Sequence, residues 1–370
     1  MKFSCAKKAF AEALQITSKA SSSKQQMPIL SGIYLKAKEN TLELQATDYE
    51  LGFIVNIPAE VEETGQIVLS GRYLQEVVRK LPGESVSFSF HREENIAHLQ
   101  SEQANFTLLS MNASEFPIIP AVEGVLSFTI EDGNLRELIK KTVFSCAMDE
   151  TRPVFTGCLM EVDENTITMA ATNTHRLSTK KITLEEPIGS IKIIIPAKSL
   201  NELLHIMNPE HPSDVQVTCS HNKISFVFDN IYMTSRLIEG SFPDYKHVIP
   251  TEFSTEAQIP VMAFSEAVDR VALISRSNEY NIMRLSFNQN QVHISSNNPD
   301  IGNADETVPI SMEGPEVNIA FNVKYITDVL KSINGEKCLF SLNQSLNPMR
   351  IMEEGDDTFL YVVTPVRTAH

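Results

Sequence analysis

Residues 72–81 read RYLQEVVRKL, and their apolar pattern returns twice, each time 126 residues further along the chain. In each copy, apolar side chains occupy positions i, i+3, i+4 and i+7, which lie on one face of an α-helix. The three copies predict a helix-containing unit that is repeated three times. Their members are Leu74, Val77, Val78 and Leu81; Leu200, Leu203, Leu204 and Met207; and Ile326, Val329, Leu330 and Ile333.

A second repeated stretch precedes this helix in each unit. It begins with another helical pattern and continues through an apolar strand, a turn and an alternating strand, before it ends in a small polar cluster. Short helices with one apolar stripe need a sheet to cover. We therefore predict an α+β fold of three tandem similar domains, residues 1–125, 126–252 and 253–370, each with two helices packed on antiparallel sheets. The helical patterns start at Phe10, Leu135 and Phe264, and the polar clusters, 125 residues apart, are Thr47-Asp48, Thr172-Asn173 and Asn297-Asn298.

The composition is that of an acidic globular protein. The 370 residues carry 31 Lys and Arg against 47 Asp and Glu, a formal charge of −16, and 42% of them are hydrophobic. No apolar run approaches the ~18 residues that predict a membrane span, so we expect a cytoplasmic protein. The five cysteines are odd in number and form no CxxC pair, which predicts buried thiols and neither disulfides nor a zinc ribbon.

Basic residues nevertheless gather on the outward helix faces. Arg72 and Arg79 lie opposite the apolar stripe of their helix, and the equivalent positions hold Lys198 with His205, and Lys324 with Lys331. In the first helices, Lys8, Lys19 and Lys140 also point outward. A mixed-charge solvated face explains such a pattern too, since Glu76, Glu202 and Asp328 are in phase with it. The other interpretation is a weakly basic lining for a polyanion.

Four motifs resemble the bacterial DNA polymerase III beta subunit family, the sliding clamps. They are ATNTHRLS at 171–178, SFPDY at 241–245, FNVKYITDVL at 321–330 and YVVTPVR at 361–367. The resemblance covers essentially the whole chain. It implies the DNA clamp fold, closed as a head-to-tail dimeric ring around sequence-independent double-stranded DNA, with no catalysis and no cofactor.

The resemblance also implies where DNA is met. A ring needs only weak, screened contacts with phosphates, so an acidic exterior is compatible with a DNA-binding hole. Pro153-Val154 stand where some relatives place aromatic residues near DNA. The residues implied for the DNA contact are Lys24, Arg72, Arg79, Lys80, Lys198 and Lys324.

In this family, a site between the second and third domains receives short linear peptides of the polymerase III alpha subunit, the clamp loader and repair proteins. Aliphatic walls suit a Leu or Phe anchor, while His175 and Arg176 are expected to fix polar groups at the rim. Thr174, Thr364 and Val366 depart from the family pattern, and Ala369-His370 extend the tail. The implied residues are Phe155, Thr172, His175, Arg176, Leu177, Pro243, Val248, Asn322, Tyr325, Leu346, Val362, Val363, Pro365, Val366 and Arg367.

Ring closure in the family joins the edge of the first domain to the third. Phe106 and Leu108 alternate on one predicted strand face, and Leu273-Ile274 end a helix. Apolar residues on an edge strand invite pairing unless they are covered, and a second copy of the chain would cover them. Burial within the same domain is the alternative for Leu273.

We find no nucleotide-binding loop, zinc-protease motif or nucleophile elbow. His205, His211, Cys219 and His221 lack regular metal spacing, and Asp149-Glu150 are interpreted as surface acids. We predict a non-catalytic clamp that tethers the polymerase to DNA. The alternatives are a repeat scaffold that binds peptides without encircling DNA, and an enzyme with an unrecognised site.

Overall fold

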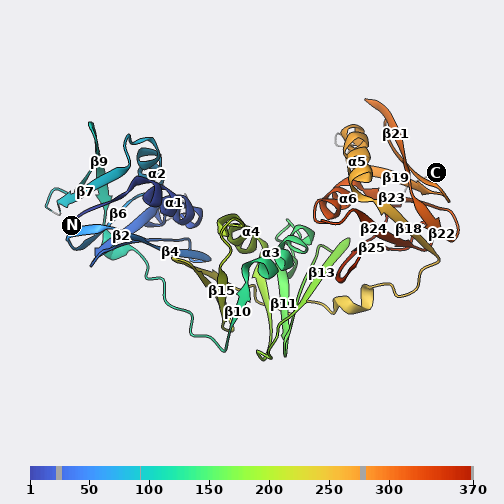
Figure 1. Ribbon diagram of the computed structural model, residues 1–370, viewed down its shortest axis with the longest axis horizontal. Coiled ribbons are helices and arrows are strands. Elements are labelled where there is room, and N and C mark those ends of the chain that lie inside the picture. The colour runs from blue at the N-terminus through green and yellow to red at the C-terminus, as the bar shows by residue number, and fades with distance from the viewer. Residues whose placement is uncertain (22–26, 92, 276–280, 368–370) are drawn as a thin grey trace. The chain divides into compact units, whose positions relative to one another are not determined.

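Six helices, two for each predicted repeat, are present in the computed structural model, which describes residues 1–21, 27–91, 93–275 and 281–367. Leu74 and Val78 are fully buried, as are Ile326 and Val329, so the apolar stripes face the interior as predicted. Figure 1 shows α1 beside α2 and α5 beside α6. The helices are α1 (Lys7–Thr17), α2 (Gly71–Lys80), α3 (Asp132–Lys140), α4 (Ala197–Ile206), α5 (Val261–Ser275) and α6 (Val323–Leu330).

The largest sheet has thirteen antiparallel strands and crosses from the first repeat to the second where β4 pairs with β17. Five residue pairs join these two strands, from Leu51 opposite Ser235 to Val55 opposite Ile231. In sheet order the strands are β10 (Leu126–Glu131), β15 (Asp214–Cys219), β16 (Lys223–Phe228), β17 (Ile231–Arg236), β4 (Leu51–Pro58), β3 (Thr41–Thr47), β2 (Gly32–Lys38), β6 (Gly65–Ser70), β9 (Ala104–Met111), β8 (Ile96–Ser101), β7 (Ser85–His91), β1 (Lys2–Ala6) and β5 (Glu60–Glu63).

The second sheet has nine strands and crosses from the second repeat to the third where β13 pairs with β26. A separate four-stranded sheet belongs to the third repeat. The nine strands in order are β14 (Ser190–Pro196), β11 (Gly157–Asp163), β12 (Thr166–Thr172), β13 (Arg176–Thr183), β26 (Asp356–Val363), β25 (Met349–Glu353), β24 (Lys337–Leu342), β18 (Thr255–Pro260) and β22 (Ser311–Glu313). The four are β21 (Gly302–Pro309), β20 (Gln291–Asn298), β19 (Ile282–Phe287) and β23 (Val317–Asn322).

The chain forms two compact units. The first comprises Met1–Gly133 with Glu202–Leu237 and contains the thirteen-stranded sheet; the second comprises Asn134–Asn201 with Ile238–His370 and contains the other two sheets. The central repeat contributes to both units. The domain boundaries at residues 125 and 252 therefore stay a prediction, whereas the α+β clamp architecture is confirmed.

Aromatic side chains occupy the centre of each unit. In the first unit, Phe3 stacks on Phe88 with ring centroids 4.7 Å apart and meets Phe10 edge-on. In the second, Phe264 meets Phe340 edge-on inside the core of the third repeat. The five cysteines are all buried and free, as predicted. Burial raises the pKa of Cys5, Cys219 and Cys338 to about 12, so these thiols are packing groups.

Candidate functional site

The nine-stranded sheet brings the predicted peptide site together at the β13–β26 strand pair, here named the β13–β26 junction. Arg176 lies opposite Val363, and Leu177 lies opposite Val362. The chain before β13 and the chain after β26 are also joined, because the backbone N–H and the hydroxyl of Thr364 donate to the carbonyl of His175 at 2.9 and 3.0 Å. Segments almost two hundred residues apart in sequence thus share one surface.

A hydrogen-bonded turn leads into β13. The hydroxyl of Thr172 accepts from the N–H of Thr174 at 3.1 Å and donates to the carbonyl of Arg176 at 2.7 Å. Oδ1 of Asn173 accepts from the N–H groups of His175 and Arg176 at 3.0 and 3.1 Å. Thr174 has a φ of +76°, a left-handed conformation that β-branched residues rarely adopt. The turn leaves the His175 side chain exposed.

An apolar cluster forms the floor of the junction. Leu177 and Val362 are buried together with Tyr245, and the half-buried Phe242 and Ile249 pack against them. The sheet supplies the first two side chains, and the segment that follows β17 supplies the others. This cluster gives the junction the aliphatic and aromatic character that a peptide anchor requires.

Val363 does not belong to this floor. Its side chain is fully buried with Tyr361 in the core of the third repeat, on the other face of the sheet from Val362. Successive side chains of a strand point to opposite faces, so Val363 and Val362 do not line the same surface. The assignment of Val363 to the peptide site is corrected to a core position.

Other predicted members stand at the surface. Val248 and Leu346 are 59% and 62% exposed. Phe155 is half-buried and meets Phe242 edge-on at 6.1 Å, and Pro243 is exposed. Phe155 is thus tied to the buried cluster through Phe242, and Val248 lies between Tyr245 and Ile249 in the sequence.

Arg176 is not at the rim. Its side chain is only 4% exposed, and Nη1 donates to Oδ2 of Asp328 at 2.7 Å. Nη2 donates to the carbonyl of Phe144, and the guanidinium lies 4.6 Å from the ring centroid of Tyr325. The expectation that Arg176 stands at the rim is therefore wrong, because its guanidinium is held inside the junction; its contact with a peptide stays a prediction.

His175 and Tyr325 present a pair of stacked rings. Their centroids are 6.5 Å apart with an interplanar angle of 17°, and Nδ2 of Asn173 donates to the Tyr325 hydroxyl at 3.3 Å. Asn322, another predicted site residue, caps α6 by accepting from the N–H of Lys324 at 2.9 Å. Asn322 therefore fixes the start of the helix that carries Tyr325.

The C-terminal segment is held against the third repeat. The N–H of Val366 donates to the carbonyl of Ala320 at 2.8 Å. Pro365 and Val366 are half-buried and Arg367 is exposed. Ala369-His370 lie outside the described residues.

A pocket of about 370 Å³ beside the apolar cluster was not anticipated from the sequence. Leu159, Ile194 and Tyr245 line it together with the charged residues Glu161 and Lys192. A hydrogen bond from Lys192 at 2.6 Å, opposed by burial, holds the pKa of Glu161 below its usual value, and burial raises the pKa of Tyr245 to about 12. The SFPDY motif at 241–245 also lines this pocket and is the signal in the sequence that marks its place, whereas an acid between two apolar residues of β11 is too common to predict a pocket.

The predicted DNA-contacting residues on helices are exposed. Arg72, Arg79 and Lys80 project from α2, while Lys198 and Lys324 lie on α4 and α6. Lys24 falls outside the described residues.

Of the other bases expected to point outward, Lys8 and Lys140 are exposed, but Lys19 is about three-quarters buried and pairs with Glu202 at 2.5 Å. The reason is local: Lys19 lies in a 3₁₀ turn beyond the end of α1, where the helical spacing no longer applies. Lys19 is therefore corrected to an internal ion pair.

The residues predicted for ring closure lie near sheet edges. β9 pairs with β8 from Ala104 to Leu109 and with β6 only at Ser110 and Met111, so among the described residues its first part has one unpaired edge. Phe106 is 39% exposed on this part and Leu108 is half-buried. Leu273 is 64% exposed at the end of α5 and Ile274 is half-buried; α5 packs on β21, the edge strand of the four-stranded sheet.

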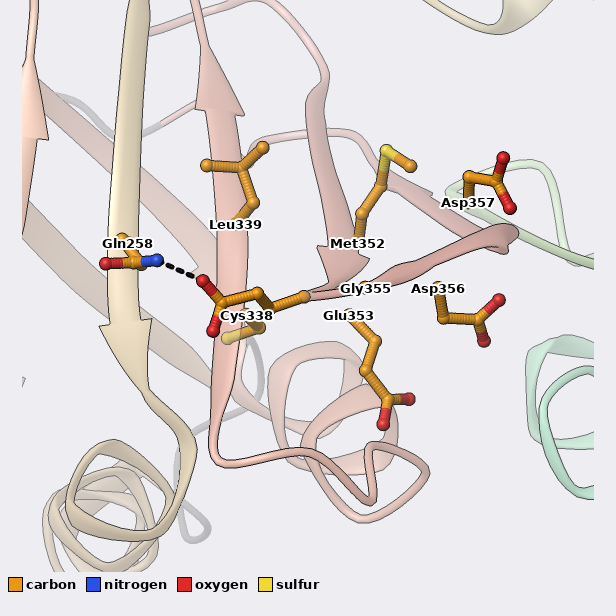
Figure 2. A pocket seen from close by; sticks show the side chains of 9 residues that line it. Gln258, Cys338, Leu339, Met352, Glu353, Gly355, Asp356 and Asp357 are labelled. Atoms are coloured by element: carbon orange, nitrogen blue, oxygen red, sulfur yellow. Dashed lines mark hydrogen bonds between the residues drawn. The ribbon is translucent and has the colours of Figure 1, made fainter.

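A second pocket, of about 390 Å³, lies at the β25–β26 hairpin and is rich in carboxylates. Figure 2 shows Glu353 and Asp356 on one side of the hairpin, opposite Met352. Glu353 pairs with the buried Lys141, and Asp356 pairs with Lys180 at 2.7 Å. These acids therefore serve as counter-ions inside the fold.

No group of three or more His, Cys, Asp or Glu side chains within the described parts of the chain could hold a metal ion. Asp149 accepts from the N–H and hydroxyl of Thr151 at 2.9 and 2.8 Å, bonds that hold its pKa below the usual value. The described helices include none that is both long and apolar enough to cross a bilayer.

Three family models together match nearly the whole chain. They describe the N-terminal, central and C-terminal domains of the DNA polymerase III beta subunit and match residues 1–120, 129–244 and 246–367. The chain belongs to this family. Its members are sliding clamps, non-catalytic processivity factors of DNA polymerase III, so membership makes this chain a DNA sliding clamp of replication.

Individual relatives agree with this placement. The chain is 32% identical to the beta sliding clamps of Bacillus subtilis strain 168, over 379 residues, and Staphylococcus aureus strain N315, over 377 residues, with full coverage of both chains in each case. The crystal structure of the B. subtilis clamp superposes with a TM-score of 0.94 over all of both chains. A Pseudomonas aeruginosa clamp solved with griselimycin bound gives 0.93 at 28% identity, again with full coverage.

Proposed function

We propose that two copies of this chain close head-to-tail into a ring around duplex DNA. The match to three consecutive clamp domains over the full length carries this proposal. Exposed bases on α2, α4 and α6 support it, since a sliding ring requires phosphate contacts that read no sequence. The unpaired edge of β9 and the edge strand β21 support closure by strand addition, because an uncovered edge is a template for another strand. We place the ring in the cytoplasm.

We further propose that the β13–β26 junction binds short linear peptides of the polymerase III alpha subunit, the clamp loader and repair proteins. The buried cluster of Leu177, Val362 and Tyr245, next to accessible apolar side chains, supports this role. Val363 is fully buried on the other face of the sheet and Arg176 pairs with Asp328, so the proposal gives both residues a supporting role. Nucleotide hydrolysis for loading would come from the loader.

The test of encirclement compares retention of the protein on circular DNA with its retention on linear DNA. The chain, loaded by a clamp loader onto nicked circular duplex DNA, is separated from free protein by gel filtration, and half of the sample is then linearised with a restriction enzyme. A ring stays on the circle and slides off the linear form. Equal retention on both forms, or loss from both, would contradict the proposal and favour a scaffold that binds peptides without enclosing DNA.

A further inference from the structure

The carboxylate of Asp328 lies between a buried cation and a surface cation. Its Oδ2 accepts from Nη1 of Arg176 at 2.7 Å and lies 3.4 Å from Nζ of Lys324, one turn earlier on α6. The Arg176 side chain is 4% exposed, whereas that of Lys324 is 59% exposed. One oxygen is thus shared by a group inside the junction and a group that solutes can reach.

Arg176 in turn supports the ring pair at the surface of the junction. Its guanidinium lies against one face of Tyr325, with 4.6 Å from Cζ to the ring centroid, and His175 stacks on the same ring. The Tyr325 hydroxyl accepts from Asn173, in the turn that carries His175. A change in the Asp328–Arg176 pair therefore reaches Tyr325 and His175 through direct contacts.

We propose that Asp328 is a positioning residue that couples DNA contact at Lys324 to peptide binding at the β13–β26 junction. The inference rests on the proposed function, which makes Lys324 a phosphate contact and the junction a peptide site. A phosphate that pairs with Lys324 competes with Asp328 for the ammonium group. Asp328 then pairs with Arg176 alone, and the guanidinium holds Tyr325 more firmly in the geometry that the peptide meets.

The expected consequence is a tighter peptide complex on DNA-loaded rings than on free rings. The effect is about twofold, because the Lys324–Asp328 contact is solvent-exposed and therefore weak. Coupling between two binding events is reciprocal, so a bound peptide raises the equilibrium affinity of the ring for DNA by the same factor.

The test measures the dissociation constant of a fluorescein-labelled peptide with a Leu-Phe anchor by anisotropy. It compares free rings with rings on closed circular duplex from which the loader has been removed by gel filtration. In the wild-type chain, DNA tightens binding about twofold. In Lys324→Met, the free ring already binds as tightly as the DNA-loaded wild type, and DNA adds nothing. Lys38→Met, which also removes an exposed lysine but lies outside the proposed DNA contacts and leaves Asp328 unchanged, retains the twofold response.

A DNA response that persists in Lys324→Met, or is lacking in the wild type, overturns the coupling. Absence of any peptide binding by the wild type is a different result, and it contradicts the proposed function itself. Asp328→Glu keeps a carboxylate and should retain the response, whereas Asp328→Asn should lose it. Where Asp328→Asn does not fold because Arg176 is left as a buried unpaired charge, Arg176→Met with Asp328→Leu removes both charges, and it too should bind with no response to DNA. A retained response in either charge-removing variant overturns the role of Asp328.

Discussion

The two strand pairs that join successive repeats share one backbone design but differ in their side chains. At the β4–β17 pair, the hydroxyl of Thr47 accepts from the N–H of Tyr49, and Oδ1 of Asp48 accepts from Glu50 and Leu51. At the β13–β26 junction, Thr172 and Asn173 make the same bonds 125 residues later. Both turns place their third residue at positive φ, +72° at Tyr49 and +76° at Thr174.

The difference lies in what fills the space after each turn. Gly52 stands where the later copy has Leu177, and Ile119 from the same unit packs over it, since a Cβ at Gly52 would lie 3.4 Å from Ile119. The early pair therefore leaves little room for a side chain at this position, whereas the later pair holds a buried leucine there, and the charges of the early pair, Glu50 and Arg236, stay at the surface. The two strand pairs thus share their turn but differ in the side chains that follow it, and we propose peptide binding for the later pair alone.

The largest difference between the regions of the β4–β17 pair and the β13–β26 junction should be in how much an ion pair stabilises the fold. Glu353→Ala leaves Lys141, 1% exposed, without its counter-ion, and unpairing a buried charge costs about 3–5 kcal/mol of unfolding free energy. Glu50→Ala breaks an exposed pair and should cost less than about 1 kcal/mol. Urea denaturation followed by circular dichroism measures both. Similar losses in the two variants would show that the joints are not held differently.

Peptide affinity should respond at one joint only. Val248→Ser removes an exposed apolar contact and should weaken a Leu-Phe peptide about tenfold, since a central contact contributes about 1–2 kcal/mol. Its match is Ile118→Ser, in the equivalent segment of the first unit, where the side chain is 89% exposed; no change in affinity is expected. A loss of affinity with Ile118→Ser would mean that both joints bind peptide. Val363→Ala, by contrast, should act through stability because Val363 is a core residue.

The two turns should differ in strain. A left-handed backbone costs about 1–2 kcal/mol for a residue with a Cβ, and most for a β-branched one, while glycine loses about 0.5–1 kcal/mol of entropy. Thr174→Gly should therefore raise the unfolding free energy by about 0.5–1 kcal/mol, and Tyr49→Gly by less. Thermal denaturation of both variants tests the order. A destabilised Thr174→Gly would show that the hydroxyl or methyl group of Thr174 makes a stabilising contact.

The smallest effect concerns pH. Burial opposes ionisation of Asp356, but hydrogen bonds from Lys180 and Thr358 outweigh it and hold its pKa below the ordinary 3.8. A carboxyl with a lowered pKa stabilises the fold above about pH 4 and loses this contribution as the pH falls through the folded-state value. Asp356→Asn should thus be destabilised at pH 7, and its gap from the wild type should narrow at a pH below the ordinary 3.8, as measured by urea midpoints. Glu137, which also pairs with Lys180, limits the loss. An unchanged gap at both pH values would contradict this linkage.

The architecture could be predicted because it depends on periodicity. The stripes containing Leu74 and Ile326 are visible in the sequence, and repetition at a constant interval made each copy evidence for the others. The site could be predicted only in outline. Tyr361, Val362 and Val363 form an unbroken apolar run, so no alternation shows which of them faces the core.

Buried charges were the other feature of the site that could not be predicted from the sequence. In the sequence Arg176 follows His175, but the counter-ion of Arg176, Asp328, is 152 residues away. The sheet that joins β13 to β26 brings these two distant charges together. Helical or strand periodicity in the sequence does not predict such a pairing. For the same reason the interpretation of Asp328 as a solvated acid missed its role.

Both extended sheets run unbroken through a repeat boundary, and this has a mechanical consequence. A force that pulls one repeat from the next must shear a ladder of five residue pairs at β4–β17 or at β13–β26. The load is shared across a whole ladder, so no single connecting segment bears it alone. Such strand pairs suit a sliding clamp that must stay intact while the polymerase moves it along DNA.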